Sequence, residues 1–344
     1  MKVGLVYDPI YLKHDTGRHV ESAVRLVESA RLLDEVDLTQ KLIALPAKPA
    51  KDAELLLVHS PQHISRIKDT AERGGGWLDP DTVMSPASYE VALYAAGGVI
   101  EAVEAVVNGE LNSAFALVRP PGHHATYHRA MGFCLFNNIA IGAKYALNTL
   151  KLDRILIADF DVHHGNGTQE TFYADPQVLY FSTHQYPFYP GTGAVEESGV
   201  GEGEGATVNV PLPAWCGDEQ YLTVFEEILA PLAQRFRPQL VLVSAGYDPH
   251  WADQISLMQL SVAGFAQITT ILARLAGELC SGRIVFTLEG GYNTEALANS
   301  IKATLEVLLG RTEIDDPLGK SAYGGRAPDI KALLGEVKRV HHLG

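Results

Sequence analysis

Short apolar segments alternate with longer amphipathic segments along most of the chain. The apolar segments are rich in Val, Ile and Leu, and they cover residues 3–7, 114–118, 155–158, 178–181, 240–244 and 284–288. Strands that are apolar at successive positions are buried on both faces, which is typical of parallel sheets. The amphipathic patterns predict helices over roughly 20–35, 60–73, 87–108, 137–149, 217–235, 261–280 and 294–309. Together they predict an α/β fold in which helices cover both faces of a mostly parallel sheet.

No segment of the chain reads as a boundary between domains. There is no internal repeat, low-complexity tract or proline-rich linker, and the glycine-rich stretches at 74–76 and 199–205 are short enough to be loops. A length of 344 residues allows one large α/β domain or two smaller ones. We therefore expect residues 1–344 to form a single domain.

Composition and charge exclude several classes of partner. Hydrophobic residues make up 47% of the chain and charged residues 20%, as in globular proteins with a substantial core. The formal net charge of −14 disfavours binding to nucleic-acid phosphates; it would attract a cationic substrate, and it also serves solubility. The N-terminus lacks the features of a signal peptide, and no apolar run approaches the roughly 18 residues that span a bilayer. The cysteines form no CxxC pair and so give no sign of disulfides or of a thiolate zinc site, which fits a cytoplasmic protein. From the charge and the lack of a membrane-spanning run, we expect neither nucleic-acid nor membrane partners.

Polar clusters directly follow four of the predicted strands. They read RPPGHHA after 114–118, DFDVHHGNGTQ after 155–158, AGYDPH after 240–244 and LEGGYN after 284–288. In open parallel sheets, ligands bind outside the carboxyl ends of the strands. These clusters are therefore where we expect the chemistry.

Three residues of these clusters can hold one metal ion. Asp161 and His163 lie two positions apart at a strand end, where alternation points both side chains to the same side. Asp248 ends another strand in an equivalent place. One imidazole and two carboxylates suit a catalytic Zn²⁺ that keeps an open position, and the sequence does not distinguish Zn²⁺ from Fe²⁺. A structural Asp161–His163 pair is the alternative, but four clusters after four strands argue against it.

Adjacent histidines supply groups that exchange protons near neutral pH. His123 and His124 follow a stiff Pro-Pro-Gly turn, which could direct both toward one site. We expect general acid and base roles for them, with Asp159 orienting one imidazole and the neutral amide of Asn166 holding the other.

Tyr292 could contribute a phenol to the same site. It follows Gly290 and Gly291, which would let the phenol enter without backbone clash. A phenolic hydroxyl can donate to the oxygen that becomes negative in a tetrahedral intermediate. Without the other clusters, a packed core tyrosine would be the preferred interpretation of Tyr292.

Taken together, the motifs resemble those of a known enzyme superfamily. RPPGHHA, GFCLFNNIAIGA, DFDVHHGNGTQ, STHQYPFYPGTG, NVPLP, SAGYDPH and LEGGYN are similar to the histone deacetylase and acetylpolyamine amidohydrolase superfamily, especially its class II and bacterial branch. The resemblance runs from about Gly4 to Leu309, and several long motifs in the right order make it specific. It implies a three-layer arginase/deacetylase-like fold with about eight strands in the central sheet. It also implies zinc-dependent hydrolysis of an acyl amide on a lysine-like amine.

The resemblance assigns a role to individual residues of the catalytic centre. It makes Asp161, His163 and Asp248 the ligands of one Zn²⁺, and Tyr292 the phenol that polarises the carbonyl. Of the tandem histidines, the second becomes the proton-transfer residue and the first, backed by Asp159, a mainly electrostatic one.

The resemblance also implies the surroundings of that centre. The substrate pocket would include Gly132, whose carbonyl would accept the scissile amide N–H, Phe133 and Tyr189 as tunnel walls, Ile255 and Gly290. A structural K⁺ would fall on Asp159, Asp161, His163 and Ser182, mostly through main-chain oxygens.

Two features depart from the family pattern. Tyr189 stands where the tunnel wall is usually Phe. The segment HDTGRHVESAVR resembles the family's His-Pro-Glu-x-Pro-x-Arg but lacks both prolines, so the roles of His19 and Arg25 at the pocket floor stay open.

Other activities on the same fold fit the sequence less well. An arginase-like dimanganese hydrolase would need a second Asp where Gly165 stands. A catalytically inactive module that only binds acyl-lysine would not need all the catalytic residues. In this chain every catalytic position carries the expected residue, including Tyr292.

Two substrates agree with the motifs, namely acetyl-lysine in a protein or peptide and, as the alternative, an N-acetylated polyamine. The stretch GGGWLDPDTVM leaves no room for the long insertion that narrows the entrance of bacterial acetylpolyamine enzymes. Ile255 lies where a polyamine-selective relative places an acidic residue, and Asp79 or Asp81 could pair with a substrate backbone amide at the rim. We therefore expect acetyl-lysine, while the sequence leaves the oligomeric state open.

Overall fold

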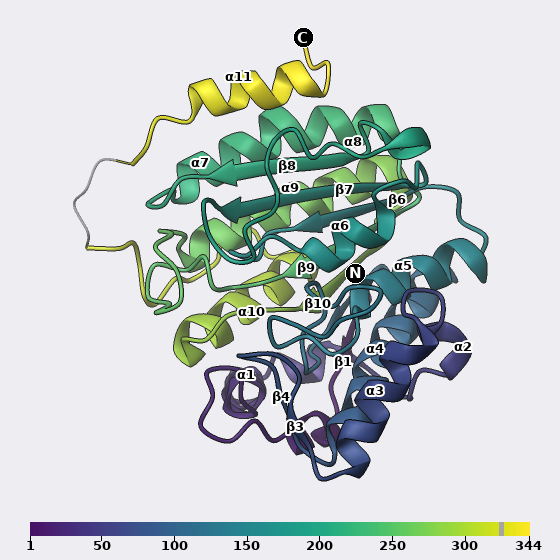
Figure 1. The fold of residues 1–344 in the computed structure, drawn as a ribbon. Helices are drawn as coiled ribbons and strands as arrows, with labels where there is room; N and C mark the ends of the chain where they lie inside the picture. The colour runs from purple at the N-terminus through teal and green to yellow at the C-terminus, as the bar shows by residue number, and fades with distance from the viewer. Residues whose placement is uncertain (323–326) are drawn as a thin grey trace.

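A central sheet of eight parallel strands organises the chain. The computed structural model describes residues 1–322 and 327–344, and these residues also contain a small antiparallel pair, β3 (Gly76–Trp77) with β4 (Val83–Met84). The order of the large sheet is β2-β1-β5-β10-β9-β6-β7-β8 (Figure 1). Its strands are β1 (Val3–Val6), β2 (Ile43–Leu45), β5 (Ser113–Ala116), β6 (Ile155–Asp159), β7 (Val178–Gln185), β8 (Thr207–Leu212), β9 (Leu240–Ala245) and β10 (Ile284–Leu288). The predicted α/β fold with a mostly parallel sheet of about eight strands is confirmed.

Helices cover both faces of this sheet. On one face α4 (Ser88–Val107) packs against α5 (Asn138–Asn148), and both contact the central strands. On the other face α9 (Val262–Cys280) packs against β9 and α10 (Thr294–Leu308), and α10 in turn packs against α1 (Val24–Glu35) (Figure 1). The remaining helices are α2 (Asp52–Leu55), α3 (Pro61–Glu72), α6 (Asn166–Phe172), α7 (Asp218–Val224), α8 (Ala230–Phe236) and α11 (Lys331–Val340).

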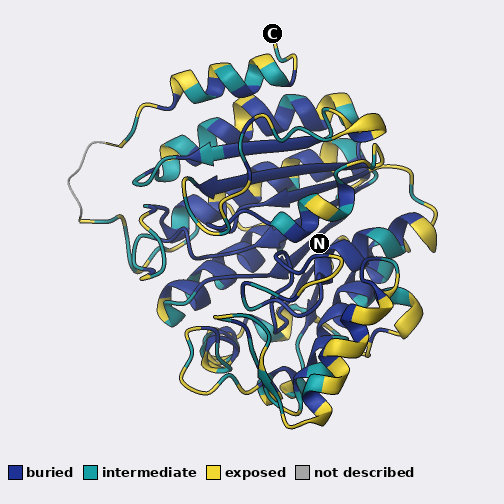
Figure 2. Ribbon diagram, in the orientation of Figure 1, coloured by how far each residue is buried: buried dark blue, intermediate teal, exposed yellow. Residues whose placement is uncertain are grey.

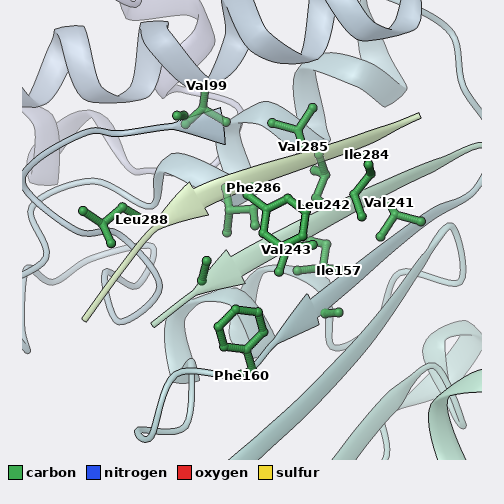
Figure 3. Packing of buried hydrophobic residues seen from close by; sticks show 14 of the residues in the cluster. Val99, Ile157, Phe160, Val241, Leu242, Val243, Ile284, Val285, Phe286 and Leu288 are labelled. Atoms are coloured by element: carbon green, nitrogen blue, oxygen red, sulfur yellow. The ribbon is translucent and has the colours of Figure 1, made fainter. Parts of the chain in front are cut away.

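The core lies along the middle of the sheet. Every residue of β5, β6, β9 and β10 is buried, so that neighbours such as Leu242 and Val243, which point to opposite faces, are both covered (Figure 3). Most exposed residues lie on the outer sides of the helices and in loops (Figure 2). Burial on both faces is what the continuous apolar segments of the sequence indicate.

The two edge strands do not show the continuous apolar pattern that predicts the buried strands. β2 has only three residues, two of them exposed. β8 carries Asn209 and Pro211, and proline is tolerated here because β8 pairs with β7 on one side only.

The observed helices differ from the prediction in several places. The helix expected over 217–235 is interrupted by a π-helical turn, Phe225–Leu229, which separates α7 from α8. The first helix begins at Val24, and α2, α6 and α11 have no counterpart in the prediction. Among the residues described, none of the helices is both long and apolar enough to cross a bilayer.

Candidate active site

The four polar clusters meet at one edge of the sheet. β5, β10, β9 and β6 are neighbours in that order, so the loops that follow them lie side by side. These loops surround a cavity of about 220 Å³. The cavity is lined by Asp81, Pro121, His123, His124, Gly132, Phe133, His163, Phe188, Tyr189, Ile255, Gly290 and Tyr292.

The predicted metal ligands form a buried cluster. One ligand atom from each of Asp161, His163 and Asp248 lies within 4.8 Å of the others. His163 Nδ1 is 3.0 Å from Asp161 Oδ1 and 3.4 Å from Asp248 Oδ2. The second oxygens accept backbone N–H groups, from Gly290 at 2.8 Å and from Val162 at 2.9 Å. Asp248 Oδ2 is buried yet accepts no hydrogen bond, so an acceptor points into the cluster without a partner.

The charges of this cluster suit a cation. Burial, with the negative charge of Asp161, raises the pKa of Asp248 to about 7. Burial acts the same way on Asp161, but His123 and His163 outweigh it and hold the pKa of Asp161 below its ordinary value. Two buried carboxylates beside one imidazole are costly without a counter-ion, and a divalent metal supplies one. The donor set and the unpartnered oxygen therefore fit a metal ion.

The tandem histidines are held by different partners. His123 Nδ1 lies 3.1 Å from Asp159 Oδ2, and His124 Nδ1 lies 2.8 Å from the amide oxygen of Asn166. Burial opposes a charge on His123, but Asp161 and Asp159 outweigh it and raise the pKa of His123 to about 10. Burial and the neighbouring histidines lower the pKa of His124 well below its ordinary value. These shifts favour a charged His123 and a neutral His124 with Nδ1–H toward Asn166, which leaves the His124 Nε2 as a proton acceptor.

Tyr292 stands over a buried arginine. The Arg25 guanidinium carbon is 4.9 Å from the centroid of the Tyr292 ring, and Arg25 Nε donates to the carbonyl of Gly291 at 2.7 Å. Burial raises the pKa of Tyr292 well above its ordinary value, so the phenol keeps its proton and can donate it. The role of Arg25 was open in the sequence; the structure places it under the site, where Glu21 four residues earlier pairs with it.

Two glycines are required by close approach. A β carbon on Gly290 would lie 2.1 Å from Asp248 Oδ2, so this glycine makes room for the carboxylates and does more than free the phenol. Gly132 has φ +55°, and a β carbon there would lie 2.3 Å from the His124 ring. Its carbonyl accepts a hydrogen bond from Cys134 Sγ at 3.2 Å.

Aromatic side chains form the walls of the cavity. Phe133 meets the Tyr292 ring edge-on at 5.8 Å, and Tyr189 meets the His124 ring at 5.1 Å. Phe188, which the sequence reasoning missed, stacks on His163 with ring centroids 5.2 Å apart. Its place beside Tyr189 in the YPFYPGTG motif is the signal that could have found it.

The rim residues take different positions. Asp81 and Ile255 line the cavity. Asp79 is not among the lining residues, and its Oδ1 accepts the N–H groups of Asp81 and Thr82 and so shapes the turn. The His19 ring packs edge-on against Phe133 at 4.7 Å.

Two residues of the expected potassium site, Asp159 and Ser182, are neighbours in the sheet, whereas Asp161 and His163 follow the end of β6. Ser182 lies beside Asp159 in the register of β6 and β7. Its hydroxyl is 2.9 Å from His184 Nδ1. Potassium binding itself stays a prediction.

Two buried carboxylates near the site have no counterpart in the sequence prediction. Glu289 Oε2 accepts the N–H groups of Gly122 and His123, at 2.7 and 3.1 Å. Asp253 Oδ2 accepts the N–H of Tyr292 at 2.6 Å. Each lies in a loop that carries a predicted site residue, which is the only sequence signal they give.

Known proteins resemble the chain over most of its length. Residues 19–308 match the histone deacetylase domain. A probable deacetylase of Archaeoglobus fulgidus is 43% identical over 298 residues, which cover 86% of this chain and 82% of that protein. Histone deacetylase 14, chloroplastic, of Arabidopsis thaliana is 38% identical over 351 residues, covering 96% and 83%. The crystal structure of the HDA15 HD domain superposes with a TM-score of 0.89 at 33% identity, covering 98% of this chain and 95% of that one. With sequence and fold in agreement over nearly its whole length, the chain belongs to the histone deacetylase family.

Proposed function

We propose that the chain is a zinc-dependent deacetylase that hydrolyses the acetyl amide of acetyl-lysine in a protein or peptide. One observation carries this proposal: a cavity of about 220 Å³ with aromatic walls reaches His163 of the metal cluster, both tandem histidines and Tyr292. Pockets with apolar walls and a few convergent polar groups bind a ligand in one orientation. An unbranched side chain that ends in a neutral amide suits these dimensions.

Asp161, His163 and Asp248 would hold the metal. Three protein ligands of these kinds leave a coordination position open, as catalytic zinc sites do. A zinc ion held here would supply the Lewis acidity that activates a water molecule and polarises the amide carbonyl. Metal analysis distinguishes zinc from Fe²⁺, which the same donors accept.

The chain's own residues would move the protons. Neutral His124 would take a proton from the attacking water through Nε2 and deliver it to the amine nitrogen as the C–N bond breaks. Cationic His123 would stay protonated and stabilise the negative charge that develops nearby. Tyr292 would donate to the carbonyl oxygen, while the carbonyl of Gly132 would accept the amide N–H. The products are acetate and the free amine.

The mouth of the cavity supports the choice of acetyl-lysine over acetylpolyamine. Ile255 lines the cavity and offers nothing to the distal ammonium of a polyamine. Asp81, also on the lining, can accept an N–H from a peptide backbone. The proposal is tested by measuring kcat/KM for acetyl-lysine peptides and acetylated polyamines side by side, and we expect the peptides to be preferred.

Placing a charge at Ile255 sharpens this test. Ile255→Glu would add an ion pair to the distal ammonium worth about 1–2 kcal/mol, which is roughly five- to thirtyfold in kcat/KM for polyamines relative to peptides. The gain should shrink at high salt, and Ile255→Gln, which is similar in shape but uncharged, should not show it. A wild type that prefers acetylpolyamines, with a ratio unmoved by Ile255→Glu, would favour the polyamine function instead.

We also propose that Asp159, Asp161, His163 and Ser182 bind a structural potassium ion, mostly through main-chain oxygens. Support comes from the family resemblance and from the adjacency of Asp159 and Ser182 in the sheet. A bound ion stabilises the folded state, so KCl should raise the melting temperature above that in choline chloride at equal ionic strength. Ser182→Ala should reduce this difference. Equal melting temperatures in both salts would contradict the potassium site.

A further inference from the structure

A single buried carboxylate joins the loop that carries Tyr292 to the loop that carries Ile255. Asp253 lies in the loop after β9, and its Oδ2 accepts the N–H groups of Tyr292 at 2.6 Å and Asn293 at 2.9 Å. Its Oδ1 accepts the N–H of Ile255 at 3.1 Å. Asp253 itself is 5% exposed, so these bonds are shielded from water. β9 and β10 are neighbours in the sheet (Figure 1), which brings the two loops together.

The peptide group before Tyr292 is held from both sides. Arg25 Nε donates to the carbonyl of Gly291, and Asp253 accepts the N–H of Tyr292, which belongs to the same peptide group. Gly291 has φ +112°, a backbone conformation that glycine adopts without the steric penalty of a β carbon. Hydrogen bonds to charged groups are stronger than neutral ones, so an arginine and an aspartate are suited to fix this plane.

We propose that Asp253 is the positioning residue that sets where Tyr292 stands over the substrate carbonyl. This inference rests on the proposed function, because it presumes that the Tyr292 hydroxyl acts in deacetylation. Asp253 does not line the cavity and so acts through the backbone of Tyr292. Misplacement of a reacting group by about 1 Å can cost a hundredfold in rate. Rate, rather than substrate affinity, is therefore the quantity that Asp253 controls.

The test is a double-mutant cycle on acetyl-lysine peptide with the zinc-loaded enzyme. Asp253→Asn keeps the shape but replaces one acceptor oxygen by an NH₂ group, so it cannot accept from both loops. We expect kcat to fall by roughly ten- to a hundredfold, KM to change much less, and zinc content to stay unchanged. In the Tyr292→Phe background the same substitution should cost less than about twofold, because no hydroxyl is left to misplace.

Asp316→Asn is the matched control. The Asp316 carboxylate also accepts three backbone N–H groups, from Ala263, Leu318 and Gly319, and is not among the residues that line the cavity. It should leave kcat and KM at wild-type values. The comparison separates the effect of Asp253 on the position of Tyr292 from the general effect of replacing a carboxylate that accepts backbone N–H groups.

Some results of this cycle would overturn the role of Asp253, and others would count against the proposed function. Wild-type kcat in folded Asp253→Asn, or an equal fold loss in both backgrounds, overturns the inference. If Asp253→Asn does not fold, Asp253→Ser enters the same cycle, and failure of both to fold overturns it too, because Asp253 would then serve fold stability. An inactive wild type or an unaltered kcat in Tyr292→Phe instead counts against the proposed function.

Discussion

Gly290 shows how a single residue shapes the buried cluster of Asp161, His163 and Asp248. A β carbon there would lie 2.1 Å from Asp248 Oδ2 and 2.6 Å from Asp161 Oδ2, both inside van der Waals contact. Its N–H donates to Asp161 Oδ2 at 2.8 Å. The residue therefore provides space for the two carboxylates that are proposed to hold the metal, and a hydrogen bond that orients one of them.

We therefore expect Gly290→Ala to lower the metal content of the protein more than it lowers the stability of the fold. We expect elemental analysis to find about one zinc per wild-type chain, and most of it to be lost in Gly290→Ala and in Asp248→Ala, because two well-placed ligands seldom retain the ion. Gly277→Ala is the control, since nothing lies within 4 Å of a β carbon there. It should keep its zinc and raise the free energy of unfolding by about 0.5–1 kcal/mol, as alanine favours a helix. Full zinc content in Gly290→Ala would refute this account.

At the scale of elements, the sequence predicts the centre of the molecule well and its periphery poorly. Strands buried on both faces leave continuous apolar segments, so β10 over Ile284–Leu288 is predicted at its observed bounds. β2 and β8 lie at the edges, where exposure and a proline erase that pattern. The five residues Phe225–Leu229 form a π-helical turn, and hydrophobic periodicity does not predict such a turn.

The same contrast holds within the site. The parallel sheet alone places side chains that follow neighbouring strands at one edge, so Asp161, His163 and Asp248 could be grouped from the sequence. The cavity walls and the tunnel roles came from resemblance. Asp253 and Glu289 act on backbone N–H groups of distant loops, and such contacts leave no spacing to recognise.

At the scale of the whole molecule, buried histidines make the fold sensitive to acid. Burial lowers the pKa of His14 to about 4, of His59 to about 3 and of His341 to about 4. Each is lower in the folded chain than the ordinary value of 6.5, so the unfolded chain binds more protons between these values. Their contribution is complete above pH 6.5 and is lost as the pH falls toward 4.

Urea unfolding at pH 7, 6 and 5 measures this loss. Each of these histidines should lower the free energy of unfolding by about 1.4 kcal/mol per pH unit across the window. His341→Leu removes one of them at a place where, among the residues that the structure describes, neither ring nitrogen has a hydrogen-bond partner. It should reduce the pH dependence of the free energy of unfolding by about one bound proton. A free energy of unfolding that stays constant from pH 7 to 5 would be incompatible with neutral buried histidines.

The order of the strands determines when the sheet can be completed during synthesis of the chain. β10 is encoded after every other strand, yet it pairs with β5 on one side and β9 on the other. While the chain emerges from the ribosome, β2-β1-β5 and β9-β6-β7-β8 can form only two half-sheets with open inner edges. Open edges invite pairing with other chains, and such long-range closure is slow. The sheet therefore closes only when β10 joins the two halves, and only then can Tyr292 meet the buried cluster of Asp161, His163 and Asp248.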